Sequence, residues 1–386
     1  MSDLFISYAR KDEATAKLLR TMLDSEGWDT WMDQEIRVGR SWSTEIERAL
    51  DRARAVTVLW TKAALQSEWV LREAGYALTQ GKLFGLLLED CAVPKQFAAV
   101  EMAMMPGWRG EADHPELIQL FRSLAETVRP SRIDTVRPGY DSRFLGESFR
   151  IGWPAVHGTA QQLHYLHFSV VMNPARRLAW YVAYNTDATK PQRLPRRNDR
   201  WMPDPLVTEH LQPSNRHFMA SGFDRGHLAA RSALAWGEER QAGIASRQAF
   251  FWTNTGPQHP HLNRGSYLAV ELWERKRAER HGRLTGLCGP VFGAADPRFR
   301  DEQEGDDGFV AYGTFQIPQA YWKVVAGVDA AGELRQRAFL FPNSEPDAAV
   351  RPQRRDPLAF AVDLAEVAAR TNLAFPRILV EAPTLD

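Results

Sequence analysis

The stretch GFDRGHLAAR at residues 222–231 places Asp224, Arg225 and Gly226 directly before His227. Neither a helical nor a strand period explains this order of residues. A neutral imidazole, with an unperturbed pKa near 6.5, can take a proton from a water molecule at neutral pH. A lone histidine in a glycine-bearing turn is more often structural, so its role depends on the residues that accompany it.

A second group of polar residues follows, where Asn254, Asn263 and Glu271 stand among apolar residues in FWTNTGPQHPHLNRGSYLAVELWE. An unsatisfied buried amide costs about 1–3 kcal/mol, so these asparagines are either hydrogen-bonded or hold a ligand. One amide oxygen, several waters and a substrate phosphate suffice for Mg²⁺. A helix that starts at about Asn263 places Glu271 two turns on and about 80° around, where it can orient the waters of the metal. A base, a metal ligand and a phosphate binder make a phosphodiesterase.

These residues resemble the DNA/RNA non-specific endonucleases of the ββα-metal class, the endonuclease G-like family. The resemblance implies an α+β domain with an antiparallel sheet that cleaves DNA or RNA without base contacts. The matching segments are GYDSRFLG (139–146), DRGH (224–227), TNTGPQ…LNRG…E (253–271), TGLCGPVF (285–292) and IPQAYWKVV (317–325).

Each residue of these motifs then acquires an implied role. His227 is the general base, Asn263 binds Mg²⁺ or Mn²⁺ directly, and Glu271 supports the water shell of the metal. Asn254 holds the loops around the histidine, and the turn that presents it is shaped by Asp224, Arg225 and Gly226.

The resemblance also implies an upstream arginine that stabilises the charged phosphorane. The stretch RRNDRWMPDP offers Arg197 or Arg200, and we favour Arg197. One departure from the family is visible, because proline usually follows DRGHLA and this chain has Ala230.

The elements that must position these residues lie in residues 144–386, which read as an α+β domain. LHYLHFSVVMN and RLAWYVAYNTD flank an NPAR turn, and AYWKVVAGVDA and LRQRAFLF flank an AG turn, so both pairs predict β-hairpins. Helical periodicity returns in GSYLAVELWERKRAERHG and in PLAFAVDLAEVAART. An antiparallel sheet with helices is expected.

Residues 1–128 show a different sequence pattern, in which short apolar runs alternate with segments of helical periodicity. This order predicts a doubly wound α/β layer with a buried parallel sheet. FISYARKD, WMDQEIRVGRSWSTEIERAL and AVTVLWTKAALQSEWVLREAGYAL resemble a bacterial TIR (Toll/interleukin-1 receptor) domain, which implies a flavodoxin-like fold. Such domains either assemble through TIR–TIR contacts or cleave the nicotinamide bond of NAD⁺.

The SxWxxxE helix of NAD⁺-cleaving TIR domains is matched by Ser67, Trp69 and Glu73. Glu73 is then the catalytic candidate, since a carboxylate can stabilise an oxocarbenium-like state. The alternative is a surface glutamate that pairs with a helix neighbour such as Arg72. The implied contacts to NAD⁺ come from Phe5, Ser7, Trp31, Asp33, Trp42 and Trp69.

Length and composition set the frame for both domains. With 386 residues we expect two domains, 1–128 and 144–386, joined by the Pro- and Arg-rich connection 129–143. Residues 1–130 carry 16 basic and 20 acidic residues (net −4), and the remainder carries 32 and 28 (net +4). Two cysteines, an acidic start and the lack of a long apolar run predict a cytoplasmic protein without a membrane segment.

Three functions fit these patterns. In the first, the TIR domain senses a signal or a nucleotide second messenger, self-associates and licenses metal-dependent cleavage of DNA or RNA, as in prokaryotic antiphage effectors. In the second, the TIR domain consumes NAD⁺ or makes a nucleotide signal, and the nuclease domain senses nucleic acid. In the third, the TIR domain is a non-enzymatic adaptor.

Overall fold

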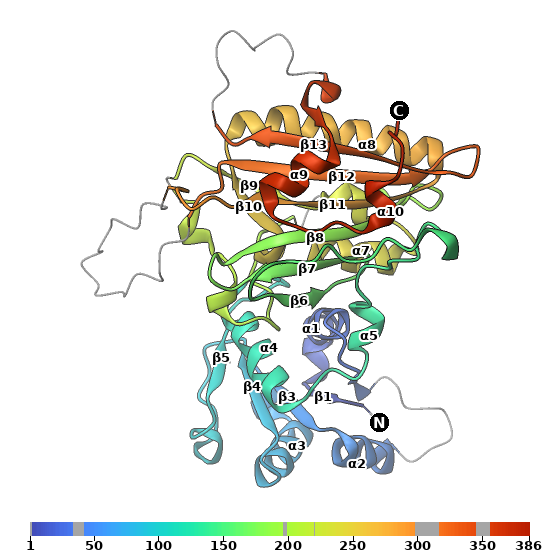
Figure 1. Cartoon of the computed structure of the whole chain (residues 1–386). Coiled ribbons are helices and arrows are strands. Elements are labelled where there is room, and N and C mark those ends of the chain that lie inside the picture. The colour runs from blue at the N-terminus through green and yellow to red at the C-terminus, as the bar shows by residue number, and fades with distance from the viewer. Residues whose placement is uncertain (1, 34–41, 196–198, 220, 298–315, 345–355) are drawn as a thin grey trace. The chain divides into compact units, whose positions relative to one another are not determined.

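The computed structural model describes the 386-residue chain except for residues 1, 34–41, 196–198, 220, 298–315 and 345–355 (Figure 1). The chain divides into two compact units, Met1–Arg137 and Pro138–Asp386. This division falls inside the segment 129–143 that we expected to connect the domains.

The first unit is built on a five-stranded sheet with the order β2-β1-β3-β4-β5. All neighbouring strands run parallel, which confirms the expected flavodoxin-like α/β class. Apolar runs such as AVTVLW are buried along their whole length, as a sheet covered on both faces requires. The strands are β1 (Leu4–Ser7), β2 (Thr30–Trp31), β3 (Ala55–Trp60), β4 (Leu83–Leu87) and β5 (Met102–Met104), and the α-helices are α1 (Glu13–Ser25), α2 (Trp42–Arg52), α3 (Glu68–Thr79), α4 (Pro115–Thr127) and α5 (Ile133–Val136).

Side-chain alternation separates the two faces of this sheet. Phe5, Val56, Val58 and Trp60 pack with residues of α3 in one apolar cluster. Because successive side chains of a strand point to opposite faces, Thr57 and Leu59 of β3 face away from α3.

The chain that leaves the first unit is tied to it by hydrogen bonds. Ser131 N donates to Asp3 Oδ2 (2.8 Å), and Arg132 N donates to Gly27 O (2.8 Å). Arg137 pairs with Glu26 at 2.6 Å, and the side chains are only 6% and 0% exposed. The first half of segment 129–143 therefore belongs structurally to the first unit.

The second unit is built on a seven-stranded sheet with the order β14-β13-β12-β11-β8-β7-β6. Its strands pair antiparallel throughout, which confirms the expected α+β class, and β7–β8 and β12–β13 are the two hairpins that the sequence indicated. The strands are β6 (Gln161–His164), β7 (Phe168–Asn173), β8 (Leu178–Asp187), β11 (Arg283–Val291), β12 (Ala320–Val328), β13 (Leu334–Pro342) and β14 (Ala361–Val362).

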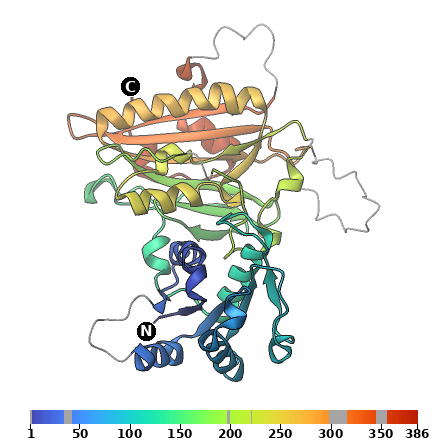
Figure 2. The same cartoon turned by 180° about the vertical axis from the view of Figure 1, so that it is seen from behind.

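Helices cover both faces of the large sheet. Figure 1 shows the short helices α9 (Leu364–Thr371) and α10 (Arg377–Val380) in front of it. Figure 2, seen from behind, shows α7 (Glu239–Gln248) and α8 (Leu268–His281) on the other face. The short α6 spans Arg231–Leu234.

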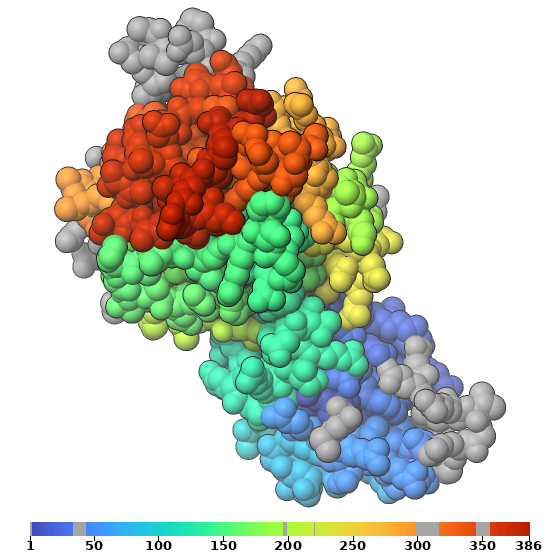
Figure 3. Space-filling view, turned by 45° about the vertical axis from the view of Figure 1, so that its right-hand side comes forward, coloured from blue at the N-terminus to red at the C-terminus, as the bar shows by residue number. Residues whose placement is uncertain are grey.

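The start and the end of the second unit lie side by side on its surface. Ala155 and Ala374 form an isolated antiparallel bridge. Figure 3 shows the green and red segments that carry them in contact.

Cys91 and Cys288 are both free thiols. Across the described parts of the chain, no helix has the length and apolar character that a membrane span needs.

Candidate functional site

A small ββα unit brings the motif residues of the second unit together. β9 (Asp224–His227) pairs antiparallel with β10 (Thr255–Gln258), with His227 opposite Thr255 and Asp224 opposite Gln258. The DRGH motif is therefore a short strand, and the turn expected there is wrong. One π-helical turn, Leu262–Tyr267, follows and runs directly into α8. Three segments that are separate in sequence thus form one local structure.

His227 lies in an aromatic pocket with an unused nitrogen. Its ring is 4.4 Å from Trp201 and 4.7 Å from Phe250, centroid to centroid. Nε2 is buried and has no hydrogen-bond partner among the residues that the structure describes. Burial, and then the positive charge of Arg231, lowers the pKa of His227 to about 3. The imidazole is therefore neutral at physiological pH.

Asn254 fixes the chain that follows the histidine. Its side chain is fully buried, and Oδ1 accepts from Ala229 N at 3.0 Å. Nδ2 donates to Ala229 O and to Ala249 O, each at 2.9 Å. The amide has satisfied its hydrogen-bonding groups within the protein, so it supports the loop at 228–230 instead of presenting a free group to a ligand.

Asn263 presents an oxygen because its nitrogen is engaged. Nδ2 donates to Asp224 Oδ2 at 3.0 Å, and this orientation is chemically required since a carboxylate only accepts. Arg264 donates twice to the same carboxylate, at 2.8 and 2.6 Å. Burial opposes ionisation, but these hydrogen bonds hold the pKa of Asp224 below its usual value. The carbonyl oxygen of Asn263 is left without a partner among the described residues.

Glu271 stands in the first turn of α8. A π turn rotates less per residue than an α turn, so it brings Glu271 closer to the face of Asn263 than the 80° of a regular helix. Burial raises the pKa of Glu271 to about 7, with Lys323 opposing the shift and Glu274 adding to it.

Two of these neighbours form a buried ion pair that sequence reasoning missed. Lys323 Nζ lies 3.0 Å from Glu274 Oε2, and both side chains are almost fully buried. Tyr184 donates to the other oxygen of Glu274 at 2.8 Å. The pair ties α8 to β12. A lysine in the apolar strand AYWKVV was the available sequence signal, because such a charge must find a partner.

Gly226 allows the two short strands to approach. A Cβ at this position would lie 2.1 Å from Gln258 Oε1. Gln258 is itself fully buried, and neither its Oε1 nor its Nε2 has a hydrogen-bond partner among the described side chains and backbone. Unsatisfied polar atoms of Gln258 and His227 thus lie on the same pair of strands.

Of the three arginines expected at this site, the structure describes Arg200 and Arg225. Arg197 lies outside the described residues, and Arg200 is exposed. Arg225 is exposed and donates to Asn215 Oδ1.

The first unit brings Ser7 and Glu73 together across 66 residues of sequence. Ser7 Oγ donates to Glu73 Oε2 at 2.6 Å, and Glu73 is only 9% exposed. Burial raises the pKa of Glu73 to about 7; the hydrogen bond from Ser7 opposes the shift and the charge of Asp33 adds to it. The alternative of a surface glutamate paired with Arg72 is wrong, since Arg72 pairs with Glu47 at 3.0 Å.

The other residues expected around NAD⁺ vary in exposure. Trp31 stacks on the buried Phe5 with ring centroids 4.8 Å apart, and Asp33 accepts a hydrogen bond from Tyr8. Trp69 is 39% exposed on α3. The side chain of Trp42 lies outside what the structure describes.

Comparison with known proteins decides the family. The sequence pattern of the DNA/RNA non-specific endonucleases matches residues 150–380. The chain belongs to this endonuclease family. A TIR domain pattern matches residues 4–119 of the same chain.

The chain is similar to bacterial and mitochondrial proteins. It is 31% identical to the uncharacterized protein y4fB of Sinorhizobium fredii over 66% of this chain and 41% of that protein. It is 28% identical to human mitochondrial endonuclease G over 62% of this chain and 77% of that protein. The crystal structure of the EndoG/EndoGI complex aligns with a TM-score of 0.46 at 19% identity, covering 64% of this chain and 92% of that chain.

Proposed function

We propose that the second unit hydrolyses phosphodiester bonds of DNA and RNA with a divalent cation, Mg²⁺ or Mn²⁺. The observation that carries this proposal is the neutral His227, whose buried Nε2 has no partner among the described residues, in the same ββα unit as Asn263. The family to which the chain belongs supports the same reaction class.

The residues present fit a cation that keeps most of its waters. The oxygen of Asn263 is free of partners in the described structure and is a hard ligand of the kind that Mg²⁺ prefers. No group of three or more His, Cys, Asp or Glu residues in the described part of the chain could form a full metal cage. Glu271 would contact waters of the ion. A bound cation would neutralise charge that develops on the phosphate.

The chain itself supplies the proton acceptor. His227 would take the proton of a water at Nε2 as the water oxygen bonds to phosphorus. The bond from phosphorus to the 3′-oxygen breaks, and this oxygen leaves with a proton from solvent, so the products carry 5′-phosphates. The low pKa of the buried ring keeps it neutral before substrate binds. A phosphodiester anion beside the ring favours the imidazolium form, so basicity rises when the substrate is in place. Arg197 would stabilise the phosphorane, and contacts limited to phosphates would make cleavage independent of sequence.

For the first unit we propose control of this nuclease. Self-association of TIR domains, or binding of a nucleotide second messenger, would switch cleavage on, as in an antiphage effector. The match of residues 4–119 to a TIR domain supports this role.

A second activity is favoured by one observation, the buried Glu73 with a pKa of about 7 beside Ser7. A carboxylate in this environment suits cleavage of the nicotinamide bond of NAD⁺. The nuclease unit would then sense nucleic acid.

The test is cleavage of plasmid DNA and of RNA by the full chain with Mg²⁺, Mn²⁺ or EDTA. Asn263→Ala is expected to raise the metal concentration for half-maximal rate by at least about tenfold, with recovery at high metal concentration. Gln161→Ala, which removes an exposed amide on the edge strand β6, is the control. Cleavage that persists in EDTA would contradict the proposal.

Control by the first unit is tested by the dependence of rate on protein concentration. A specific rate that rises steeply with protein concentration is expected if assembly switches the nuclease on. A constant specific rate, with and without NAD⁺, would contradict control by self-association.

A further inference from the structure

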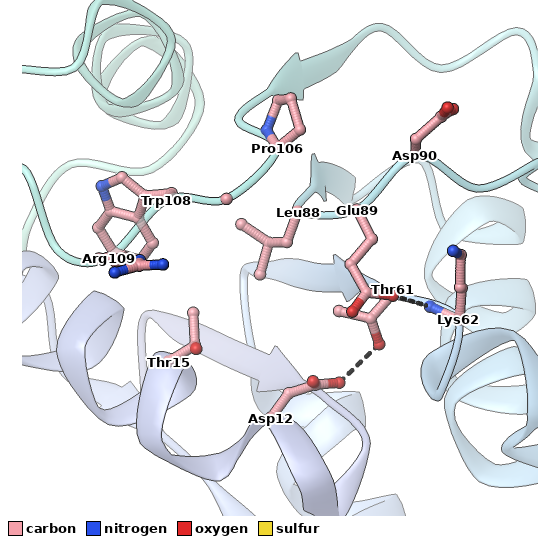
Figure 4. Close-up of a pocket in the computed structure, with 11 residues that line it drawn as sticks. Asp12, Thr15, Thr61, Lys62, Leu88, Glu89, Asp90, Pro106, Trp108 and Arg109 are labelled. Atoms are coloured by element: carbon pink, nitrogen blue, oxygen red, sulfur yellow. Dashed lines mark hydrogen bonds between the residues drawn. The ribbon is translucent and has the colours of Figure 1, made fainter.

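A cavity of about 470 Å³ opens at the carboxyl edge of the parallel sheet in the first unit (Figure 4). Its lining comes from the segments that follow β1, β3, β4 and β5. Open α/β sheets bind their ligands at this edge. The volume lies within the range of small-molecule sites.

The cavity is separate from the Ser7–Glu73 pair. Ser7 pairs in register with Val58, and Trp60 lies two residues further on the face that packs against α3. Thr61 lies just beyond the end of β3 and lines the cavity, whereas neither Ser7 nor Glu73 is among the residues that line it. The cavity and the Ser7–Glu73 pair are therefore distinct sites.

One side of the cavity presents fixed carboxylates. Thr61 Oγ1 donates to Asp12 Oδ2 at 2.6 Å and accepts from Ala64 N at 3.0 Å, so both roles of the hydroxyl are used. Glu89 Oε2 accepts from Lys62 N at 2.7 Å. Burial raises the pKa of Asp12, although the hydrogen bond from Thr61 opposes this, and the nearby charge of Glu89 adds to it. Two immobilised acceptors of this kind favour a ligand with hydroxyl donors.

The other side presents a cation and a hydroxyl. Figure 4 shows Arg109 and Thr15 across the cavity from Glu89 and Lys62. Arg109 N donates to Glu111 Oε2 at 2.8 Å, which holds the loop, while no ion pair joins its guanidinium to another described residue. An arginine fork matches the oxygens of a phosphate.

We propose that this cavity binds a phosphorylated ribose, either a free sugar phosphate or the ribose phosphate of a nucleotide. The phosphate lies against Arg109 and Thr15, and the ribose hydroxyls donate to Asp12 and Glu89. The carboxylate side also carries Lys62 and Asp90, so it holds three carboxylates against one ammonium. This net negative charge opposite Arg109 fixes the direction of the ligand. A bare cation would use only the carboxylates and would leave Arg109 without a function.

Calorimetric titration of the full chain with AMP, ribose 5-phosphate, ribose and inorganic phosphate tests the proposal. We expect AMP or ribose 5-phosphate to bind at least about tenfold more tightly than ribose or phosphate alone. Equal affinity for the two phosphorylated ligands identifies a sugar phosphate, and tighter binding of AMP identifies a nucleotide. Direct binding is measured, so neither nuclease nor NAD⁺ activity is required.

Variants connect the binding to this cavity. Arg109→Gln and Asp12→Asn are each expected to weaken binding by about tenfold or more, with Glu89→Gln as the second carboxylate variant if Asp12→Asn does not fold. Arg52→Gln, at an exposed arginine outside the cavity, is the matched control and should bind as the parent does. Binding that is lost in Glu73→Gln but kept in Arg109→Gln would overturn the proposal. So would Mg²⁺ binding that depends on Asp12 without any binding of the phosphorylated ligands.

Discussion

The two candidate catalytic groups, Glu73 in the first unit and His227 in the second, are both removed from water, but they differ in how they are satisfied. Glu73 accepts a 2.6 Å hydrogen bond from Ser7. His227 Nε2 has no partner among the described residues. The neutral ring nitrogen of His227 has no partner to displace, whereas the carboxylate of Glu73 is held by a group of its own chain.

The supporting residues show the same difference. In the second unit, hydrogen bonds hold the neighbours of the reactive atoms: Asn254 fixes the loop after His227, and Asp224 with Arg264 orients Asn263. In the first unit, the partner of Glu73 binds the carboxylate itself. A ligand must compete with Ser7 there. Under the proposed roles, the second unit presents its groups to a ligand without rearrangement, whereas in the first unit the hydrogen bond from Ser7 must first be displaced.

The largest expected effect comes from His227→Ala, which removes the proposed general base. The initial rate of plasmid cleavage at saturating Mg²⁺ should fall roughly 10³-fold, the typical contribution of a general base. NAD⁺ consumption, if present, should not change. His157→Ala, at an exposed histidine of the same unit, should leave the rate unaltered. A His227→Ala variant that cleaves at the parental rate would exclude His227 as the general base.

Much of the architecture could be predicted because it depends on local patterns. The hairpins β7–β8 and β12–β13 follow from apolar strands on both sides of a turn signal. The parallel sheet follows from continuous apolar runs such as AVTVLW.

The sequence could not show contacts that only tertiary packing decides. The bond between Ser7 and Glu73 joins residues 66 positions apart, and the ion pair of Lys323 with Glu274 joins residues 49 positions apart. The π turn at Leu262–Tyr267 was predicted only as a helix, since the same residues can make either hydrogen-bond register. These features determine where Glu73, Asn263 and Glu271 point.

Glu73→Gln changes the buried carboxylate that accepts the hydrogen bond from Ser7, and it should have the next largest effect. Because the pKa of Glu73 is raised to about 7, the folded protein binds this proton more tightly than the unfolded chain does. Stability from this group is fully present below about pH 4.5 and is lost as the pH rises through 7. The neutral glutamine should therefore stabilise the first unit by up to roughly 3 kcal/mol at pH 8 and by much less at pH 5.

Calorimetric unfolding of the full chain at the two pH values measures this difference. Glu126→Gln, at an exposed glutamate of the same unit, should show no dependence of this kind. Equal destabilisation by Glu73→Gln at both pH values would mean that the ionised carboxylate is stabilising. The surroundings of Glu73 would then favour the ionised carboxylate, unlike those of His227, which favour the neutral ring.

The smallest expected effect tests whether the β9–β10 pair holds His227 in one position. Gly226→Ala places a Cβ 2.1 Å from the buried Gln258 Oε1, so it should destabilise the second unit by about 1–3 kcal/mol and slow cleavage. Gly243→Ala in α7 has no atom within 4 Å of the new Cβ and should stabilise the unit by about 0.5–1 kcal/mol. Unfolding free energies and cleavage rates of the two variants are compared. If Gly226→Ala behaves as Gly243→Ala does, Gln258 moves freely, and the β9–β10 pair does not hold His227 in one position.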